Sequence, residues 1–482
     1  MALKTYHSFR ELQADVQSGV VSCEEIVGHY LRNIEEKNKT LNAFVEVYTD
    51  FALAQAQALD ARIKAGEPVG RLAGMVIGIK DVLCLKDFGL QGSSKILDKF
   101  KSQFTGTAIQ RLLDEDAIII GRQNCDEFAM GSSNENSAFG VVRNAADTTR
   151  VPGGSSGGSA VAVQADMCWA SIGSDTGGSV RQPASFCGLV GLKPTYSRIS
   201  RYGLIAYASS FDCIGPITRN VPDAALLLEV MAGADDFDST VSQKPVPAYS
   251  QQLAWNGAGK KIAYLRESLE SEAIAPAIRE SMKKRVEFLK QQGYTVEGVE
   301  FPLLEYILPT YYILTMAEAS ANLSRYDGVR YGHRTENAPD LETMYKRTRA
   351  EGFGREVKRR IMLGTFVLSA SYYDAYFTKA QRVRRLIKEK TESLLTEYDF
   401  LLMPTSPTTA FKIGENSAES DPLAMFLADI YSVQANVAGV TGISIPAGND
   451  EQNLPIGLQI MANAFRETDL LAFSNYLEQQ TF

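Results

Sequence analysis

Residues 151–184 read VPGGSSGGSAVAVQADMCWASIGSDTGGSVRQPA, and this stretch differs in character from the rest of the chain. It is dense in glycine and serine, yet residues 160–163 form the apolar run AVAV inside it. Flexible linkers of similar composition are uniformly polar, so the apolar run argues against a linker. We expect tight loops packed among buried elements, with two glycine-serine blocks at residues 151–159 and 173–184.

The first block contains GGSSG at residues 153–157, which matches the G-x-S-x-G pattern of a nucleophile elbow. An elbow follows an apolar strand and needs a histidine late in the chain. Residues 144–152 are polar, and of the three histidines, His7, His29 and His333, only His333 comes late enough. His333 lies in a polar, arginine-rich segment, which is typical of a surface residue rather than of a buried base.

A serine nucleophile that lacks a histidine needs another base, and a lysine with a lowered pKa can act as one. Model lysine titrates near 10.4, so neutrality requires a shift of roughly three units, or about 4 kcal/mol of differential desolvation. Lys80 stands in the apolar segment GMVIGIKDVLCL, residues 74–85, whose pattern predicts a buried strand. This segment alone leaves two interpretations open: a desolvated base, or a strand-end lysine that points to solvent.

The second block contains SDTGGS at residues 174–179. Two glycines before a serine allow a tight turn that exposes backbone N–H groups, and such a nest can bind the oxyanion of a tetrahedral intermediate. An ordinary glycine-rich turn or a phosphate loop would look similar. However, the Gly-Lys-Ser/Thr of a Walker loop and the G-x-G-x-x-G of a dinucleotide fold are both missing from this block.

Taken together, the two blocks resemble the signature of the amidase family, without a gap in either block. The resemblance implies an α/β fold in which helices cover both faces of a large mixed β-sheet. It implies a relay in which Lys80 is the base, Ser155 is a cis-configured relay and Ser179 is the nucleophile, with no metal required. It assigns the oxyanion to backbone N–H groups around Thr176, Gly177 and Gly178.

Segments outside the signature resemble the A subunits of tRNA-dependent amidotransferases. They include Asp126–Ser132, Gly191–Tyr196, Arg201–Leu204, Glu318–Gly328 and Glu351–Arg360. The resemblance covers nearly the whole chain and implies one amidase domain over residues 1–482. Within it we expect a helical segment to about residue 65, a signature core at about 70–220, and a remainder that completes the sheet and the substrate pocket.

By this resemblance the chain hydrolyses glutamine. The glutamine head group carries an ammonium and a carboxylate, so a selective pocket needs an anion and a cation at a set separation. The resemblance assigns the carboxylate to Arg360, the ammonium to Asp429 and a hydrogen bond to Tyr311, with Met130 and Gly131 also at the substrate. In the basic run at residues 358–360, Arg359 is a near rival of Arg360.

The same resemblance implies that the released ammonia passes to partner B and C subunits in a heterotrimer. The partner would bind ATP and Mg²⁺ and amidate Glu-tRNA(Gln), Asp-tRNA(Asn) or both. The first alternative is a stand-alone amidase acting on other small amides, which would keep the relay but lack the Arg360–Asp429 pair. The second is a non-catalytic scaffold. The presence of Lys80, Ser155 and Ser179 argues against it.

Composition agrees with an enzyme subunit that does not hold nucleic acid by itself. The net charge is −8 and the pI about 5.3, whereas phosphate contacts need clustered lysine and arginine. The six cysteines form no C-x-x-C pair, so they predict neither a zinc site nor a thioredoxin motif. No secretory apolar core and no apolar run of roughly 18–20 residues occurs, so we expect a cytoplasmic protein without a membrane span.

Periodicity predicts alternating strands and helices outside the signature. Capping-box spacing at Ser8 and Ser22 starts two helices, and a long helical stretch covers about 357–395. Ser197 departs from the family pattern because glycine is usual at that position, as does the spacer at residues 164–169. Further strands are expected at 117–121, 261–265, 295–301, 400–403, 442–446 and 455–460, helices at 107–113 and 278–293, and loops at 234–259 and 412–422.

Overall fold

One mixed β-sheet runs through the computed structural model, which describes residues 3–415 and 428–480. The strands are β1 (Phe44–Val47), β2 (Val76–Lys80), β3 (Ile118–Gln123), β4 (Ala170–Asp175), β5 (Val190–Lys193), β6 (Cys213–Thr218), β7 (Lys261–Leu265), β8 (Thr295–Val299), β9 (Phe400–Pro404), β10 (Thr441–Asn449) and β11 (Pro455–Ala462). Within the described residues, these eleven strands lie side by side in the order β1-β3-β2-β4-β6-β5-β10-β11-β9-β7-β8. The expectation of a large mixed sheet is confirmed.

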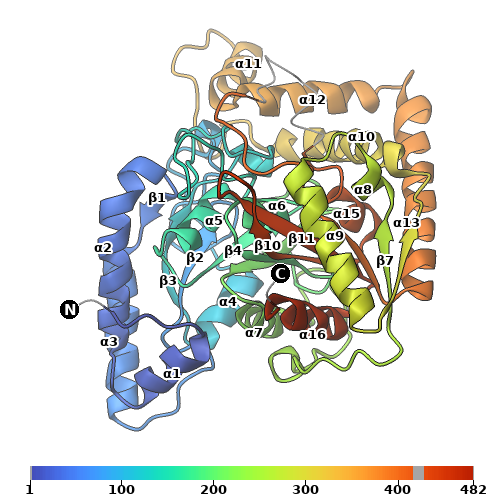
Figure 1. Cartoon of the computed structure of the whole chain (residues 1–482). Helices are drawn as coiled ribbons and strands as arrows, with labels where there is room; N and C mark the ends of the chain where they lie inside the picture. Colours follow the sequence, from blue (N-terminus) through green and yellow to red (C-terminus); the bar gives the residue numbers. More distant parts are fainter. Residues whose placement is uncertain (1–2, 416–427, 481–482) are drawn as a thin grey trace.

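Helices cover both faces of this sheet. They are α1 (Phe9–Gln17), α2 (Cys23–Leu41), α3 (Thr49–Lys64), α4 (Thr107–Asp114), α5 (Gly157–Gln164), α6 (Arg181–Phe186), α7 (Val221–Met231), α8 (Glu267–Glu270), α9 (Pro276–Gln291), α10 (Leu304–Asn322), α11 (Leu341–Gly352), α12 (Arg355–Val367), α13 (Lys379–Glu397), α15 (Val433–Ala438) and α16 (Glu467–Glu478). Helices α5 and α6 lie above the central strands in Figure 1, and α7 and α16 lie below them. The α/β architecture is therefore as expected. None of the described helices is long and apolar enough to cross a membrane.

Parallel pairing brings the ends of β2 and β4 together at one edge of the sheet. Strand β2 pairs in parallel with β4, with Ile77 opposite Ala170 and Ile79 opposite Ile172. Because parallel strands end at the same edge of a sheet, Lys80 at the end of β2 lies beside the last residues of β4. The order of the strands therefore places Lys80 next to the end of β4, where the second glycine-serine block begins.

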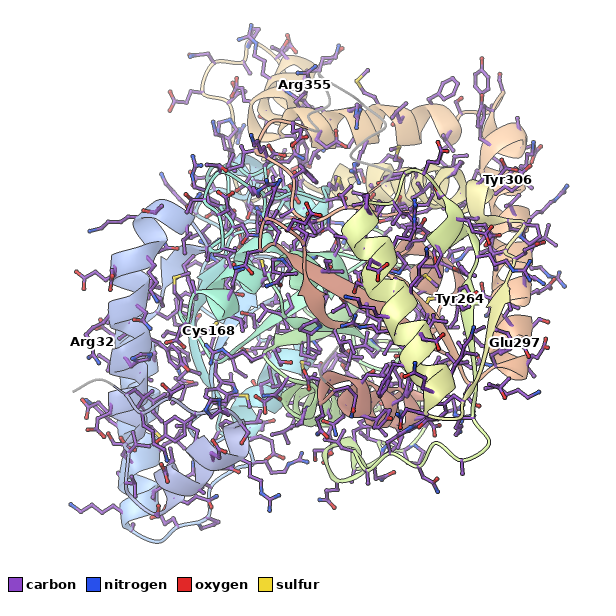
Figure 2. All side chains as sticks on the ribbon, in the orientation of Figure 1. Arg32, Cys168, Tyr264, Glu297, Tyr306 and Arg355 are labelled. Carbon is purple, nitrogen blue, oxygen red and sulfur yellow. The ribbon has the colours of Figure 1, made fainter. Side chains whose placement is uncertain are left out.

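The N-terminal segment is largely helical, as expected, but it also contributes a strand. Ser22 and Glu25 form the full capping box at the start of α2, with each side chain bonded to the backbone of the other residue. Strand β1 follows α2 and pairs antiparallel with β3, so this segment extends the sheet. In Figure 2, Arg32 on α2 points outward whereas Cys168 lies inside the body, and the six cysteines are all buried and unpaired with one another.

Two expected elements differ from the structure, and a third lies mostly outside the described residues. The strand predicted at 74–85 ends at Lys80, because Val82 and Leu83 turn back to donate to its carbonyl. The helix predicted at 357–395 is two helices, α12 and α13, with a π-helix at Tyr373–Thr378 before α13. The chain leaves α12 near Ser369, whose Oγ donates to the Phe366 carbonyl at 2.8 Å. Of the loop expected at 412–422, residues 416–422 lie outside the described residues.

Ser197 occupies a backbone conformation that explains why glycine suits this position. Its φ is +76°, in the left-handed region where a side chain costs about 1–2 kcal/mol. Its carbonyl accepts the Ser242 N–H at 2.8 Å, which holds the turn in this conformation. The serine is tolerated here but is not the residue that the backbone favours.

We expect Ser197→Gly to raise the free energy of unfolding by about 1 kcal/mol, because glycine removes the strain while costing some entropy in the unfolded chain. Urea unfolding followed by tryptophan fluorescence would measure the change. Ser197→Ala is the matched control and should give no gain, since alanine retains the Cβ. A glycine variant that is less stable than the wild type would contradict this account.

Candidate active site

Lys80 is buried at the end of β2 and faces three serine hydroxyls. It is fully shielded from solvent, so the interpretation of a solvent-pointing lysine is wrong. Its Nζ lies 2.7 Å from Ser155 Oγ, 2.9 Å from Ser156 Oγ and 3.0 Å from Ser174 Oγ. The lysine thus joins the first block, which supplies Ser155 and Ser156, to the end of β4, which supplies Ser174.

Burial gives this lysine the pKa of a usable base. Desolvation lowers the pKa of Lys80 to about 8, against the opposing attraction of Asp126, Asp175 and Asp212 among nearby groups. At neutral pH roughly one molecule in ten then carries the neutral amine. A neutral amine beside a hydroxyl can accept its proton, which is the requirement for a base in a serine relay.

Ser155 and Ser179 are brought together by the backbone. The Gly154–Ser155 peptide bond is cis, as the resemblance implies. The Ser156 N–H donates to the Ser179 carbonyl at 3.2 Å, so the two glycine-serine blocks lie against each other. Ser179 is 8% exposed and precedes α6. Among the described residues, no side-chain hydrogen bond joins Ser155 to Ser179 in this structure.

A buried ion pair shapes the turn that carries Ser179. Arg181 and Asp175 are both fully buried and make two hydrogen bonds, of 3.0 Å from Nε and 2.9 Å from Nη2. Asp175 also accepts the Gly178 N–H at 2.8 Å and the Val180 N–H at 3.2 Å. Burial alone would raise the pKa of Asp175, but Arg181 outweighs it and holds the pKa at about 2. The carboxylate therefore stays charged and fixes the loop.

This pair engages one of the three N–H groups expected at the oxyanion. The Gly178 N–H is directed at Asp175, so it is not free for a ligand in this structure. Within the described chain, the N–H groups of Thr176 and Gly177 donate no hydrogen bond, and the Thr176 hydroxyl donates to Asp212 at 2.6 Å. The two remaining N–H groups are the candidates for the oxyanion. Gly178 is needed for another reason, because its φ of +130° and the adjacent Ser432 leave no room for a Cβ.

Arg360 lies inside the protein, whereas Arg359 lies near the surface. The Arg360 residue is 2% exposed, and its guanidinium donates to Glu356 and to the Tyr207 hydroxyl at 2.7 Å each. Its guanidinium carbon lies 5.6 Å from the ring centroids of both Tyr207 and Tyr312. The Arg359 side chain is 31% exposed and pairs with Glu356 at 2.8 Å. Arg360 thus faces the tyrosine cluster formed by Tyr207, Tyr311 and Tyr312.

Asp429 lies at the hydroxyl of Tyr312. The Tyr312 hydroxyl lies 3.5 Å from Asp429 Oδ2, and the Ser132 hydroxyl donates to the same oxygen. Burial raises the pKa of Asp429 to about 7. A cation bound there would lower this pKa again, so the site favours an ammonium group. Arg360 and Asp429 thus both lie against Tyr312 and could offer a cation and an anion to one ligand.

Tyr311 connects this cluster to the second glycine-serine block. The Tyr311 hydroxyl packs so closely on Gly177 that a Cβ there would lie 2.6 Å from it. Met130 is fully buried, and a Cβ on Gly131 would overlap the carboxylate of Asp126. Arg360, Asp429 and Tyr311 thus meet around Tyr312, and the role of Met130 and Gly131 at the substrate stays a prediction. Tyr207, Tyr312 and Ser132 were not assigned from the sequence, although Tyr312 is the neighbour of Tyr311 in the chain.

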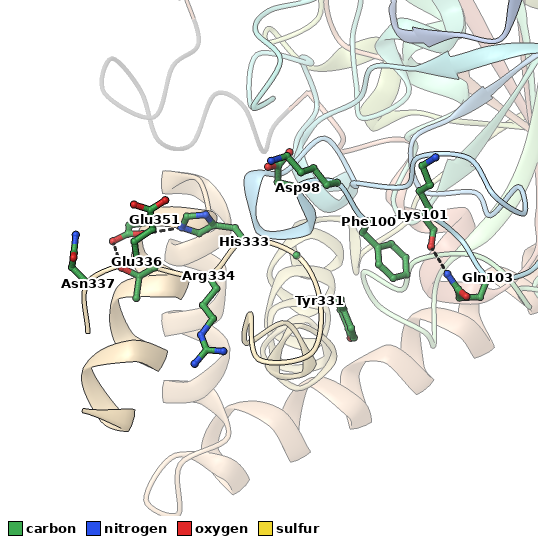
Figure 3. A pocket seen from close by; sticks show the side chains of 13 residues that line it. Asp98, Phe100, Lys101, Gln103, Tyr331, His333, Arg334, Glu336, Asn337 and Glu351 are labelled. Atoms are coloured by element: carbon green, nitrogen blue, oxygen red, sulfur yellow. Dashed lines mark hydrogen bonds and ion pairs between the residues drawn. The ribbon is translucent and has the colours of Figure 1, made fainter. Parts of the chain in front are cut away.

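The histidines take no part in this arrangement. His333 lies in a surface pocket of about 930 Å³, where its Nε2 is 2.8 Å from Glu351 (Figure 3). His29 pairs with Asp166 at 2.7 Å. Since Ser155 contacts Lys80 instead, the nucleophile-elbow interpretation of the first block is wrong. Among the described residues, no cluster of side chains suited to a metal ion is found.

Comparison with known proteins agrees with this geometry. The sequence model of the amidase family matches residues 25–471. The chain is 50% identical to the A subunit of glutamyl-tRNA(Gln) amidotransferase from Acaryochloris marina and 51% identical to that from Synechococcus elongatus, each over 98% of both chains. Among solved structures, the corresponding A subunit from Thermotoga maritima has a TM-score of 0.79 at 39% identity, covering 95% of this chain and 92% of that one. The peptide amidase of Stenotrophomonas maltophilia has a TM-score of 0.80 at 28% identity, covering 97% and 95%. The buried lysine, the paired glycine-serine loops and these relatives show that the chain belongs to the amidase family.

Proposed function

We propose that this chain is the glutaminase subunit of a tRNA-dependent amidotransferase. The observation that carries the proposal is that Arg360 lies against the ring of Tyr312 and Asp429 against its hydroxyl, within the cluster that also contacts Gly177. A glutamine could present its carboxylate to Arg360 and its ammonium to Asp429 while its side-chain amide reaches Ser179. Similarity to proteins named as amidotransferase A subunits supports the same assignment.

In the proposed reaction, neutral Lys80 accepts the Ser155 proton while Ser155 accepts the proton of Ser179. The Ser179 oxygen bonds to the amide carbon, and the resulting oxyanion is held by the N–H groups of Thr176 and Gly177. When the carbon–nitrogen bond breaks, the relay returns a proton and ammonia leaves. Water then attacks the acyl-enzyme, glutamate is released and Ser179 regains its proton.

Ammonia from this site is useful only to a second active site. We propose that the chain works in the cytoplasm as the A subunit of a heterotrimer, in which a partner binds ATP, Mg²⁺ and the misacylated tRNA. The net charge of −8 agrees with a subunit that leaves tRNA to its partner. We also propose that residues 1–482 form one domain, because the sheet of the described residues includes strands from Phe44 to Ala462. A stand-alone amidase would need no such cation and anion.

The direct test is glutamine-dependent amidation of tRNA. We expect the chain, purified from its native cell, to bring two further subunits with it and to release ammonia from glutamine in that complex. Ser179→Ala should abolish the glutamine-dependent reaction but leave amidation with added ammonia intact. Turnover of unrelated amides with none of glutamine, or full glutamine-dependent activity in Ser179→Ala, would overturn the proposal.

The activity should depend on the protonation of Lys80. The pKa of Lys80 is lowered to about 8, so the neutral base is present above pH 8 and is lost as the pH falls below it. We expect kcat/KM for glutamine to rise about tenfold per pH unit from pH 6 and to level off near pH 8. Lys80→Arg, which stays protonated, should be folded by circular dichroism and inactive throughout. A flat profile between pH 6 and 9 would contradict the assigned base.

Substitution of the two neighbouring arginines should affect KM for glutamine to different degrees. Arg360→Gln should raise KM for glutamine roughly 10- to 100-fold, because a charged hydrogen bond to the carboxylate contributes about 1.5–3 kcal/mol. Arg359→Gln is the matched control and should change KM less than twofold, since Arg359 lies near the surface. Steady-state kinetics on both variants would measure this. Equal effects in the two variants would remove Arg360 from its proposed role.

A further inference from the structure

Glu127 joins the two halves of the proposed glutamine pocket. Its carboxylate is buried, with the residue 4% exposed, and it accepts the Gly354 N–H at 2.8 Å on Oε2 and 3.1 Å on Oε1. The Ser94 hydroxyl donates to the same carboxylate. The backbone N–H of Glu127 donates to the Asn136 carbonyl at 2.5 Å. The side chain thus holds a helix start, while its own backbone is fixed to a neighbouring loop.

The helix start that it holds belongs to α12. Gly354 is the N-cap of this helix and has no side chain of its own to cap it. An anion at a helix N-terminus satisfies free N–H groups and interacts favourably with the helix dipole. A Cβ on Gly354 would overlap the Glu127 carboxylate, so the glycine allows this close approach. Glu127 therefore supplies from a distant segment the cap that α12 lacks.

The hydrogen bond between Glu127 and Gly354 joins two segments that serve opposite ends of the proposed glutamine head group. Helix α12 carries Arg360, the proposed partner of the glutamine carboxylate. Five residues after Glu127 along its own segment, Ser132 donates to Asp429, the proposed partner of the ammonium. The separation of cation and anion defines an α-amino acid head group. A bond from the Ser132 segment to the start of α12 helps to fix this separation.

Packing around the carboxylate reinforces the connection. Phe128 is 1% exposed and its ring centroid lies 5.8 Å from that of Phe353, the residue before Gly354. The hydrogen bond and the ring contact therefore join the same two segments at adjacent positions. A surface pocket of about 370 Å³ opens beside them and is lined by Glu127, Gly354 and Glu351 among others.

We propose that Glu127 is a positioning residue that determines specificity for substrates with an α-amino acid head group. It acts through α12 and touches neither the relay nor the scissile amide. This inference rests on the proposed function, because it concerns how glutamine is told apart from simple amides. Its loss should weaken recognition of the head group and leave the chemistry at Ser179 in place.

The test compares two substrates in the assembled enzyme: glutamine and butyramide, an aliphatic amide without either charge. For Glu127→Ala we expect KM for glutamine to rise at least tenfold, kcat at saturating glutamine to change less than threefold, and kcat/KM for butyramide to change less than twofold. Glu127→Gln should recover part of the lost affinity, because its amide oxygen can still accept the Gly354 N–H. It also keeps the proposal testable if the alanine variant does not fold.

Glu351→Gln is the matched control, since Glu351 lines the same pocket but pairs with His333. It should leave both substrates unaffected. Glu127 variants that keep the wild-type KM for glutamine, or that lose activity on both substrates equally, would overturn the positioning role alone. A wild-type enzyme that hydrolyses butyramide but not glutamine would overturn the proposed function, and this inference with it.

Discussion

The buried pair of Asp175 and Arg181 is the interaction on which the site depends most. Arg181 is fully buried and, besides Asp175, donates to Asn436 at 2.7 Å and to Gln459 at 2.5 Å. It therefore joins the signature loop to α15 and β11, more than 250 residues away in the chain. Removing one partner of such a pair leaves an uncompensated buried charge, which typically costs about 3–5 kcal/mol. The loop that carries Ser179 is thus held by electrostatics that form only in the complete fold.

Burial shifts Lys80 toward its neutral form, whereas Asp175 stays charged. A lysine with no countercharge would lose its proton easily in an apolar interior, whereas a lysine in direct contact with a carboxylate would keep it. Here the hydrogen-bond partners of Nζ are serine oxygens, and the carboxylates of Asp126 and Asp212 act from further away. The resulting pKa of about 8 lies between these limits. Asp175, which is paired with Arg181, likewise raises the pKa of Lys80 without contacting Nζ.

Local patterns in the sequence were enough to predict the α/β class and many of the strands, and the resemblance of the signature blocks named the residues of the proposed relay. The signature blocks carry their own spacing, and Lys80 is conspicuous as a charge inside an apolar strand. Features that depend on distant segments could not be read in this way. Arg181 reaches Asn436 and Gln459, which lie 255 and 278 positions later, and Tyr207 reaches Arg360 from a loop 153 positions earlier. The break between α12 and α13 likewise contains no glycine or proline, and α10 packs on both helices.

The proposed relay and the proposed glutamine pocket come from different parts of the chain. Lys80 lies at the end of β2, Ser155 in the loop before α5 and Ser179 in the loop after β4. Arg360, Tyr312 and Asp429 come from α12, α10 and the segment before α15. The two parts meet where the Tyr311 hydroxyl packs on Gly177. Because recognition is built on separate elements, it can change while the relay keeps its geometry. A family whose fold extends to a peptide amidase at 28% identity is consistent with that separation. Specificity in this fold is therefore a matter of how the later helices are held against the signature core, rather than of the nucleophile itself.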